Sequence, residues 1–266
     1  MFVDELGSGF PLIVLHGGPG MDHTMFRPYL DPLADDFRVV YVDERGQGRS
    51  DRVDPQTLSL DVFARDVDLL ADALGLDQFA LLGHSFGAIV ATYHAIDLGR
   101  ATAYVLSAAG DSSAALERDV EESLAALGDR GAPIAESWEL EKTVATADEL
   151  RRLMEAQLPF HFHGAPPRDA FRETVYSPDV LRHFANIGYG DFDYTPRLGE
   201  VSKPTLVIVG EQDRTTTVRA ARILADGIPN AELAIVPEAG HMSYVEATGP
   251  YLEQVRRFLS GVAVQA

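Results

Sequence analysis

The chain has 266 residues, of which 46% are hydrophobic and 24% are charged, and its formal net charge is −19. The hydrophobic content excludes wholesale disorder, and the length fits one α/β domain with an insertion or two small domains. Acidic residues are spread along the whole chain, which argues against binding to nucleic acid or anionic membranes, because those partners require basic patches. The same charge mildly favours a neutral or cationic substrate.

The chain contains no cysteine, which excludes disulfides, thiolate catalysis and cysteine-bound metals. The first residues include Asp4 and Glu5 but no basic segment of the kind that begins a secretory signal. The longest apolar runs are far shorter than the ~20 residues needed to span a bilayer. We therefore expect a soluble, cytoplasmic protein.

The first hundred residues alternate between predicted strands and predicted helices. Apolar runs predict strands over residues 1–6, 12–15, 38–42, 79–82 and 103–106. Gly7-Ser8-Gly9 predicts a hairpin turn after the first strand, and helices are expected over residues 24–34, 59–74 and 88–96. Ser59 is suited to cap the second helix, and Gly75 to end it. This alternation predicts a mostly parallel sheet with helices on both faces.

Residues 112–198 interrupt the alternation. They suggest helices over residues 119–127 and 147–158, punctuated by prolines, and they include the only tryptophan, Trp138. Strands over residues 205–209 and 233–236 and helices over 218–225 and from Pro250 onward then follow. We therefore predict a core made of residues 1–111 and 199–266, with residues 112–198 inserted as a helical cap or lid.

The segment Gly83-His84-Ser85-Phe86-Gly87 lies between an apolar run and a helical one. A Gly-x-Ser-x-Gly turn between a strand and a helix holds its serine in a strained, exposed conformation. Glycines at positions 83 and 87 allow the strand and the helix to pass close to each other. The alternative is a glycine-rich turn with an incidental serine. We favour Ser85 as a nucleophile.

A serine hydroxyl becomes a strong nucleophile when a histidine, oriented by a carboxylate, takes its proton. Asp213 and His241 each follow a predicted strand, and the order Ser85, Asp213, His241 is typical of hydrolases with such a sheet. Asp111 also follows a strand and is the alternative acid; Asp213 is favoured because it lies in a tight, glycine-led strand exit.

Other histidines receive structural interpretations. We expect His84 to point away from Ser85, and His16 to anchor the glycine loop that it opens. His161 and His163 suggest a metal site, but a third ligand at suitable spacing is lacking. We therefore predict neither a metal nor a cofactor.

An oxyanion formed during attack requires backbone N–H donors. The residue after the nucleophile supplies one donor, which is Phe86, and the loop at residues 16–20 supplies the other near Gly18. Tight packing of that loop, without a catalytic role, is the alternative.

With these motifs the chain resembles an α/β-hydrolase, and more closely the proline iminopeptidase group. The resemblance is carried by residues 16–20, 43–50, 83–87, 210–213 and 240–241. It implies an eight-stranded sheet with a helical cap after the sixth strand, of which about seven strands are visible here. It also implies that Ser85, Asp213 and His241 are nucleophile, acid and base, and that Gly18 contributes an oxyanion N–H.

The resemblance leaves the substrate open. Proline iminopeptidases usually carry Gly-Gly-Ser-Trp-Gly at the turn, whereas His84 and Phe86 give this chain a version common among carboxylesterases. We expect a serine hydrolase that cleaves a small ester, amide or short peptide in the manner of a proline iminopeptidase. A carboxylesterase or lactonase is the alternative, and a non-catalytic small-molecule receptor is the alternative of another class.

Substrate binding is expected from the cap. Proline iminopeptidases bind the free amine of the substrate through cap glutamates, and this cap contains Glu136, Glu139, Glu141, Glu149 and Glu155. We predict Trp138, Glu155 and Phe160 as substrate-binding residues.

Overall fold

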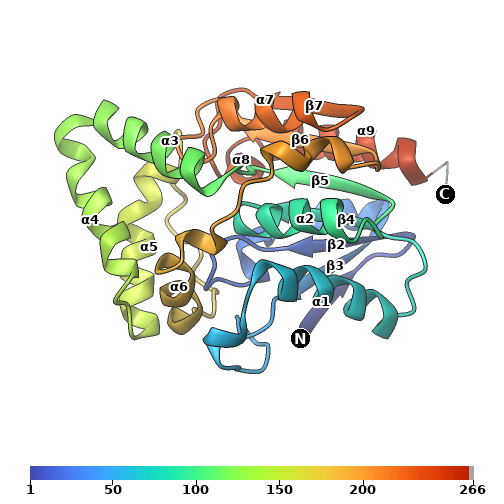
Figure 1. The fold of residues 1–266 in the computed structure, drawn as a ribbon, viewed down its shortest axis with the longest axis horizontal. Coiled ribbons are helices and arrows are strands. Elements are labelled where there is room, and N and C mark those ends of the chain that lie inside the picture. Colours follow the sequence, from blue (N-terminus) through green and yellow to red (C-terminus); the bar gives the residue numbers. More distant parts are fainter. Residues whose placement is uncertain (264–266) are drawn as a thin grey trace.

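The computed structural model describes residues 1–263. Over these residues seven strands form one sheet in the order β1-β3-β2-β4-β5-β6-β7 (Figure 1). Their bounds are β1 (Phe2–Leu6), β2 (Phe10–Leu15), β3 (Phe37–Asp43), β4 (Ala80–His84), β5 (Ala103–Ser107), β6 (Thr205–Gly210) and β7 (Ala231–Val236). The pairs from β3 to β7 are parallel, and β1 lies antiparallel to β3. The predicted mostly parallel sheet is therefore confirmed.

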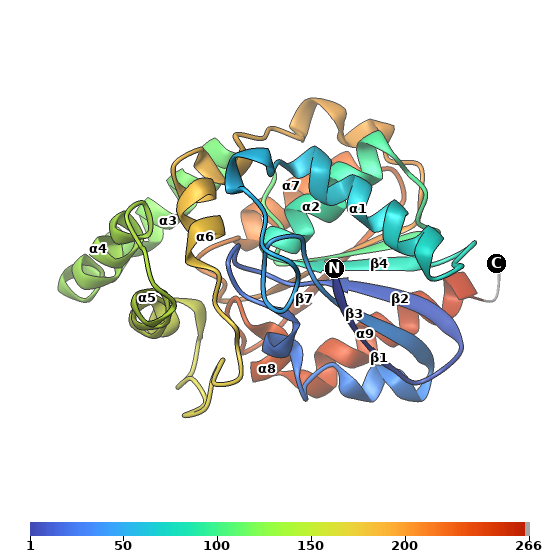
Figure 2. The ribbon, with the colours of Figure 1, turned by 90° about the horizontal axis from the view of Figure 1, so that it is seen from below.

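Helices cover both faces of this sheet. One face is covered by α1 (Leu60–Ala73), α2 (Phe86–Asp97) and α7 (Val218–Gly227), and the other by α8 (Ser243–Glu246) and α9 (Thr248–Ala263) (Figure 2). Alternate residues of β2 enter different clusters: Ile13 packs with the α1 and α2 side, and Val14 with the α9 side. Burial on both faces explains why β4, β5 and β6 read as continuous apolar runs.

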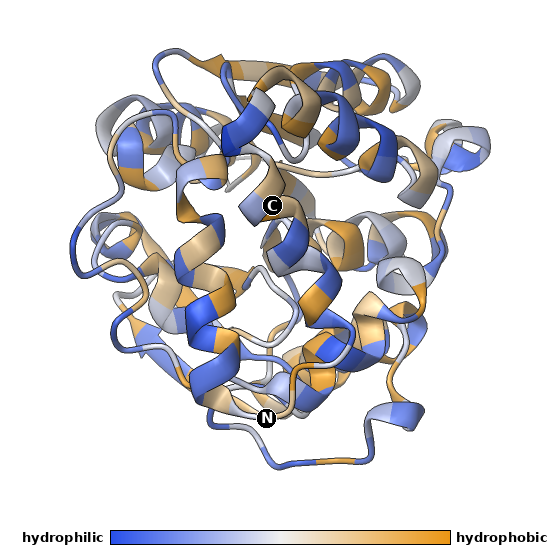
Figure 3. Ribbon diagram, turned by 90° about the vertical axis from the view of Figure 1, so that its left-hand side faces the viewer, coloured by the Kyte–Doolittle hydropathy of each residue, from blue (hydrophilic) through white to orange (hydrophobic). Residues whose placement is uncertain are grey.

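Between β5 and β6 the chain leaves the sheet and forms helices at one end of it (Figure 1). We call residues 112–198 the cap. Its helices are α3 (Ser113–Ala126), α4 (Ala132–Glu141), α5 (Ala147–His161) and α6 (Pro178–Ala185). Seen from the cap side, hydrophilic and hydrophobic residues occur along the same helices (Figure 3). No helix of residues 1–263 is both long enough and apolar enough to cross a membrane.

Helix α5 extends further than the sequence indicated. Thr146 caps its start, and Thr146 and Glu149 form a reciprocal capping box. The helix then continues through Pro159 to His161, three residues beyond the predicted end. Its last turn consequently carries the aromatic stretch toward the sheet edge.

Two local predictions are wrong. Residues 24–34 form two short 3-10 segments, η1 (His23–Phe26) and η2 (Asp31–Asp35), because Pro28 favours extended backbone at Arg27 and interrupts any helix there. Nor do β1 and β2 form a hairpin, since β1 pairs with β3. Gly7, with φ +74°, leads the chain past the Ala34 carbonyl instead, at a distance that leaves no room for a side chain.

Because the strands from β2 onward are parallel, the loops after their carboxyl ends meet at one edge of the sheet. The cap lies at that same edge (Figure 1). The loops after β2, β4, β6 and β7, which carry the predicted site residues, are thereby brought together beneath it.

Candidate active site

Ser85 lies in the turn between β4 and α2, with φ 53° and ψ −116°, a conformation that non-glycine residues rarely adopt. A side chain at Gly87 would place its Cβ 2.5 Å from the Leu15 carbonyl oxygen, so α2 crosses β2 this closely only with glycine there. The Ser85 N–H donates to the Ser107 carbonyl at 2.9 Å, which fixes the turn to β5. The strained strand-to-helix turn expected from these residues is present.

His241 and Asp213 are joined by a hydrogen bond of 2.9 Å between Nδ1 and Oδ2. Both are buried, with exposed fractions of 2% and 6%. The Asp213 carboxylate also accepts from the N–H groups of Thr215 (2.8 Å) and Thr216 (3.0 Å) and from the Thr216 hydroxyl (2.9 Å). Since an ionised carboxylate only accepts, Nδ1 of His241 carries the proton and Nε2 keeps a free lone pair.

Asp111, the alternative acid, is not part of the hydrogen bonds around His241. Its carboxyl is buried, and its nearest hydrogen-bond partner is the Ser112 hydroxyl at 3.5 Å. Burial raises the pKa of Asp111 above its ordinary value. Over residues 1–263 it makes no hydrogen bond to His241, so the geometry pairs the histidine with Asp213.

Two further histidine rings flank His241. The His84 ring lies 5.0 Å from it, centroid to centroid, and the His161 ring lies 5.2 Å from it. Burial, and next the neighbouring His241, lower the pKa of His161 to about 3 and the pKa of His84 well below its ordinary value. Both flanking rings therefore stay neutral near pH 7. The His84 ring hydrogen-bonds the Ser107 hydroxyl at 3.1 Å, and His84 lines the same cavity as Ser85.

The glycine loop passes beside Ser85. A Cβ placed on Gly17 would lie 3.3 Å from the Ser85 Cβ. His16 anchors this loop, as expected: its Nε2 accepts the Glu44 N–H at 3.2 Å, and its Nδ1 donates to the Gly17 carbonyl at 2.8 Å. Gly18 has φ +120°, which favours glycine.

A large cavity of about 870 Å³ is lined by this sheet edge and by the cap. The core residues along it include Gly18, Ser85, Phe86 and His241. From the cap, it is lined by residues that include Glu117, Glu121, Trp138, Glu139, Glu141, Lys142, Met154, Gln157, His161 and Tyr189. Its volume falls within the range of small-molecule sites. The sequence-predicted Ser85, His241, Gly18 and Phe86 thus share one cavity.

The three cap residues predicted to bind substrate differ in their position relative to the large cavity. Trp138 lines the large cavity. Phe160 does not line it: its side chain is fully buried against Trp138, with ring centroids 4.8 Å apart, so the prediction that it contacts the substrate is corrected. Glu155 is exposed and does not line the cavity, so its prediction is corrected. The cavity face of α5 carries Met154, Gln157 and His161 at helical spacing, whereas Glu155 is displaced by about 100° around the helix.

Glu141 is the cap carboxylate that the sequence did not single out. It lines the large cavity, is 2% exposed, and accepts from Gln157 Nε2 at 2.7 Å and from the Tyr189 hydroxyl at 2.5 Å. Burial raises its pKa to about 7. Had the sequence predicted helix α4, Glu141 would have been expected beside Trp138, because residues three apart lie on the same face of a helix.

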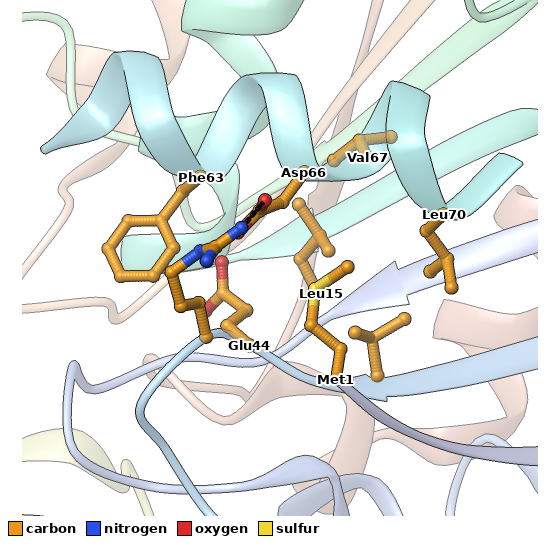
Figure 4. A pocket seen from close by; sticks show the side chains of 9 residues that line it. Met1, Leu15, Glu44, Phe63, Asp66, Val67 and Leu70 are labelled. Carbon is orange, nitrogen blue, oxygen red and sulfur yellow. Dashed lines mark hydrogen bonds and ion pairs between the residues drawn. The ribbon is translucent and has the colours of Figure 1, made fainter. Parts of the chain in front are cut away.

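A small cavity of about 10 Å³ lies beneath α1, next to Glu44, Phe63 and Asp66 (Figure 4). This is room for one water molecule. Glu44 is buried there with Oε1 unpartnered among the described residues, and burial, with the charges of Asp66 and Asp43, raises its pKa to about 8. Because this cavity is so small, the large cavity is the candidate active site.

No group of three or more His, Cys, Asp or Glu side chains suited to a metal occurs within residues 1–263. His161 and His163, the pair considered for a metal, have different partners: Thr215 Oγ1 lies 3.1 Å from His161 Nδ1, and Glu238 lies 3.8 Å from His163.

The sequence profile of the alpha/beta hydrolase fold matches residues 11–248. The chain belongs to this family. It is 27% identical over 274 residues to a proline iminopeptidase of Lactobacillus crispatus, covering 94% of this chain and 89% of the relative. Its structure is similar to a proline iminopeptidase of Mycobacterium smegmatis (TM-score 0.82, 22% identity, 99% and 95% coverage). It is also similar to an esterase of Exiguobacterium antarcticum (TM-score 0.76, 19% identity, 98% and 94% coverage).

This α/β-hydrolase is therefore an enzyme, and it is similar to proline iminopeptidases, as its motifs indicated. The fold class predicted from the sequence is confirmed as well. Its relatives are named as peptidase and as esterase, which supports hydrolysis as the reaction without fixing the bond that is cleaved.

Proposed function

We propose that this α/β-hydrolase is a serine hydrolase that cleaves an ester or amide bond of a small substrate through an acyl-enzyme. Ser85 is the nucleophile, His241 the general base and Asp213 the acid that orients it. The observation that carries the proposal is the hydrogen bond between Asp213 and His241, and His241 lines the same cavity as Ser85. The reaction requires no cofactor.

In the first step, Nε2 of His241 takes the proton of the Ser85 hydroxyl as Oγ attacks the carbonyl carbon. Asp213 accepts the Nδ1–H and stabilises the imidazolium that forms. The N–H groups of Gly18 and Phe86 stabilise the oxyanion, and the N-terminus of α2 adds favourable electrostatics because Ser85 is its N-cap. The imidazolium then protonates the leaving group. A water molecule activated by the same histidine hydrolyses the acyl-enzyme.

The acidic wall of the large cavity supports a substrate with an amine. Glutamates of α3 and α4 line it, and Lys142, which also lines it, is ion-paired with Glu139 at 2.8 Å. Glu141 is the buried member of this group, and its two hydrogen bonds leave lone pairs for another donor. A substrate ammonium beside Glu141 would favour the ionised carboxylate. We therefore propose the N-terminal residue of a short peptide, proline above all, as the preferred acyl group.

A carboxylic ester or lactone without an amine is the second candidate. The residues of the nucleophile turn favour this candidate. His84 and Phe86 stand where the Gly-Gly-Ser-Trp-Gly turn of proline iminopeptidases has its second glycine and its tryptophan. The structural similarity to an esterase agrees with that interpretation.

The division of the chain belongs to the proposal. We propose that residues 1–111 and 199–266 carry the chemistry and that residues 112–198 close over the substrate as a cap. The shared lining of the large cavity supports this division. The cytoplasmic location stays a prediction from the sequence.

Replacement of the nucleophile tests the proposed reaction. Ser85→Ala should lower kcat by roughly 10⁴-fold or more, because removal of a triad nucleophile leaves only binding and oxyanion stabilisation. Circular dichroism and thermal unfolding should match the wild type. Substantial turnover by a clean Ser85→Ala preparation would contradict the assignment.

Replacement of Glu141 tests the substrate class. If the carboxylate binds an ammonium, Glu141→Gln should raise KM for a prolyl arylamide by about 10- to 100-fold, the effect of losing a charged hydrogen bond. Acyl nitrophenyl esters without an amine should be hydrolysed as before. Glu155→Gln, on the exposed side of α5, is the matched control and should leave the hydrolysis of both substrates unchanged. Turnover of the esters alone would favour the esterase alternative.

A further inference from the structure

The last turn of α5 lies against the loop that carries His241. The His161 carbonyl accepts the His241 N–H at 2.8 Å and the Met242 N–H at 3.4 Å. A Cβ on Gly240 would lie 2.8 Å from the same carbonyl oxygen, so this approach depends on glycine at position 240. A cap residue thus bonds the main chain of the proposed general base.

The His161 side chain extends the contact to the proposed acid. Its ring is inclined by 35° to the His241 ring, with centroids 5.2 Å apart. Its Nδ1 lies 3.1 Å from the Thr215 hydroxyl, and the Thr215 N–H donates to Asp213 Oδ1 at 2.8 Å. One imidazole of the cap therefore contacts the base directly and reaches the acid through one intervening residue.

Other contacts hold this segment without using the His161 ring. Glu246 accepts the N–H groups of Gly240 (2.7 Å), His163 (3.1 Å) and Gly164 (2.7 Å). The Arg214 guanidinium donates to the Phe162 carbonyl at 3.1 Å. Because these bonds are independent of the ring, a side-chain substitution at position 161 should leave the main chain of α5 docked.

The charge state of His161 suits such a contact. Burial and the adjacent His241 lower the pKa of His161 to about 3, so the ring is neutral near pH 7. Charged or titratable groups near this contact include His84 beside His241, Asp213 behind Thr215, and Arg214, whose guanidinium donates to the carbonyls of Phe160 and Phe162 on either side of His161. A neutral ring hydrogen-bonds the Thr215 hydroxyl through Nδ1 and does not repel the imidazolium that forms on His241.

From this geometry we propose that His161 is a positioning residue of the reaction, which holds His241 and, through Thr215, Asp213 in their reactive arrangement. The cap thereby contributes to the alignment of the triad as well as to the cavity. The inference rests on the proposed function, since it requires His241 to be the general base.

Substitutions at position 161 separate its two contacts. His161→Ala removes both, and we expect kcat to fall by about 30-fold with KM nearly unchanged, which corresponds to two lost contacts of about 1 kcal/mol each. His161→Phe keeps an aromatic ring against His241, and His161→Asn keeps a hydrogen-bonding group near Thr215, so each should recover part of the loss. The rate of Ser85 labelling by a small fluorophosphonate should fall in parallel with kcat.

The neighbouring His163 provides the matched control. Its side chain is partly exposed and its nearest charged partner is Glu238 at 3.8 Å, so His163→Ala should retain the wild-type kcat. Thr215→Val gives an independent test, because it removes the hydroxyl and keeps the N–H to Asp213. It should lower kcat like His161→Phe, and the double variant should lose little more than either single one.

Several outcomes would overturn the inference. An unchanged kcat for His161→Ala would do so, as would a raised KM with unchanged fluorophosphonate labelling, which would make His161 a substrate-binding residue. Another such outcome is that the Ala, Phe and Asn variants lose kcat equally and in proportion to a fall in melting temperature. That result would show that the role of His161 is only structural. Should His161→Ala fail to fold, additive losses for His161→Phe and Thr215→Val decide against the proposal. Activity in Ser85→Ala would instead refute the proposed function.

Discussion

Buried carboxyl groups of this hydrolase have very different surroundings at the residue scale. Asp213 accepts hydrogen bonds from His241 and from the Thr215–Thr216 turn. Glu141 accepts from Gln157 and Tyr189. Glu44 retains an oxygen without a partner among the described residues. Because uncompensated burial disfavours the charged form, Glu44 is the carboxyl whose ionisation is expected to cost the fold most.

Glu44 gives a stability prediction. Its pKa of about 8 in the folded state exceeds the ordinary 4.5, so the folded protein binds more protons between these pH values and the free energy of unfolding falls as pH rises through them. Glu44→Gln removes this titration. The variant should be more stable than the wild type at pH 8, by on the order of a few kcal/mol, and much closer to it at pH 4.5.

Urea unfolding at both pH values measures this difference. Glu238→Gln is the control, because that side chain is 85% exposed. An equal pH dependence in the wild type and Glu44→Gln would show that Glu44 is not the buried, neutral group described here.

At the scale of elements, the crossing of α2 over β2 is the contact that raises Ser85 at the sheet edge. A Cβ on Gly87 would lie 2.5 Å from the Leu15 carbonyl and 2.6 Å from the His16 carbonyl. Gly87→Ala should therefore destabilise the protein by about 3 kcal/mol, the upper range for overpacking, and should also displace Ser85. Gly249→Ala is the matched control.

Gly249 lies in the first turn of α9, where an added Cβ would meet no other atom within 4 Å, so alanine there should be neutral or slightly stabilising. Chemical denaturation of both variants measures the contrast. A Gly87→Ala protein as stable and as active as Gly249→Ala would contradict the close crossing.

The elements that the sequence predicted well are those with a strong local signal. Apolar runs identified the strands, and Ser59, whose hydroxyl accepts the Val62 N–H, marked the start of α1. Helices α4 and α6 were missed because Pro133 and Pro178 were interpreted as interruptions, whereas each lies in the first turn of its helix. Proline is favoured there, since its missing N–H has no intrahelical partner to lose.

At the scale of the whole molecule, the sequence could predict the part of the candidate site that the sheet topology brings together. Parallel strands bring the loops of Ser85, Asp213 and His241 to one edge, and their order along the chain was enough to name them. The cap was not predictable in this way. Which face of α5 meets the cavity depends on packing between helices, so the sequence pointed to Glu155, which lies on the exposed side. Glu141 was not singled out from the other cap glutamates, because α4 was not recognised.

The contacts of His161 depend on the same long-range packing. His161 and His241 are distant in the sequence, and their approach requires α5 to end beside the loop after β7. The sequence offered only a metal pair with His163 as a role for His161, and set it aside for lack of a third ligand; the fold pairs His161 with Thr215 and His241.

The central claim is that Ser85 is the activated nucleophile of this hydrolase, and covalent labelling tests it most directly. The enzyme should be incubated with a fluorophosphonate and the modified peptide located by mass spectrometry, with Ser85→Ala and His241→Ala in parallel. We predict one adduct per chain, on Ser85, absent from Ser85→Ala and much slower to form in His241→Ala. An adduct on another residue, or an active enzyme that takes up none, would contradict it.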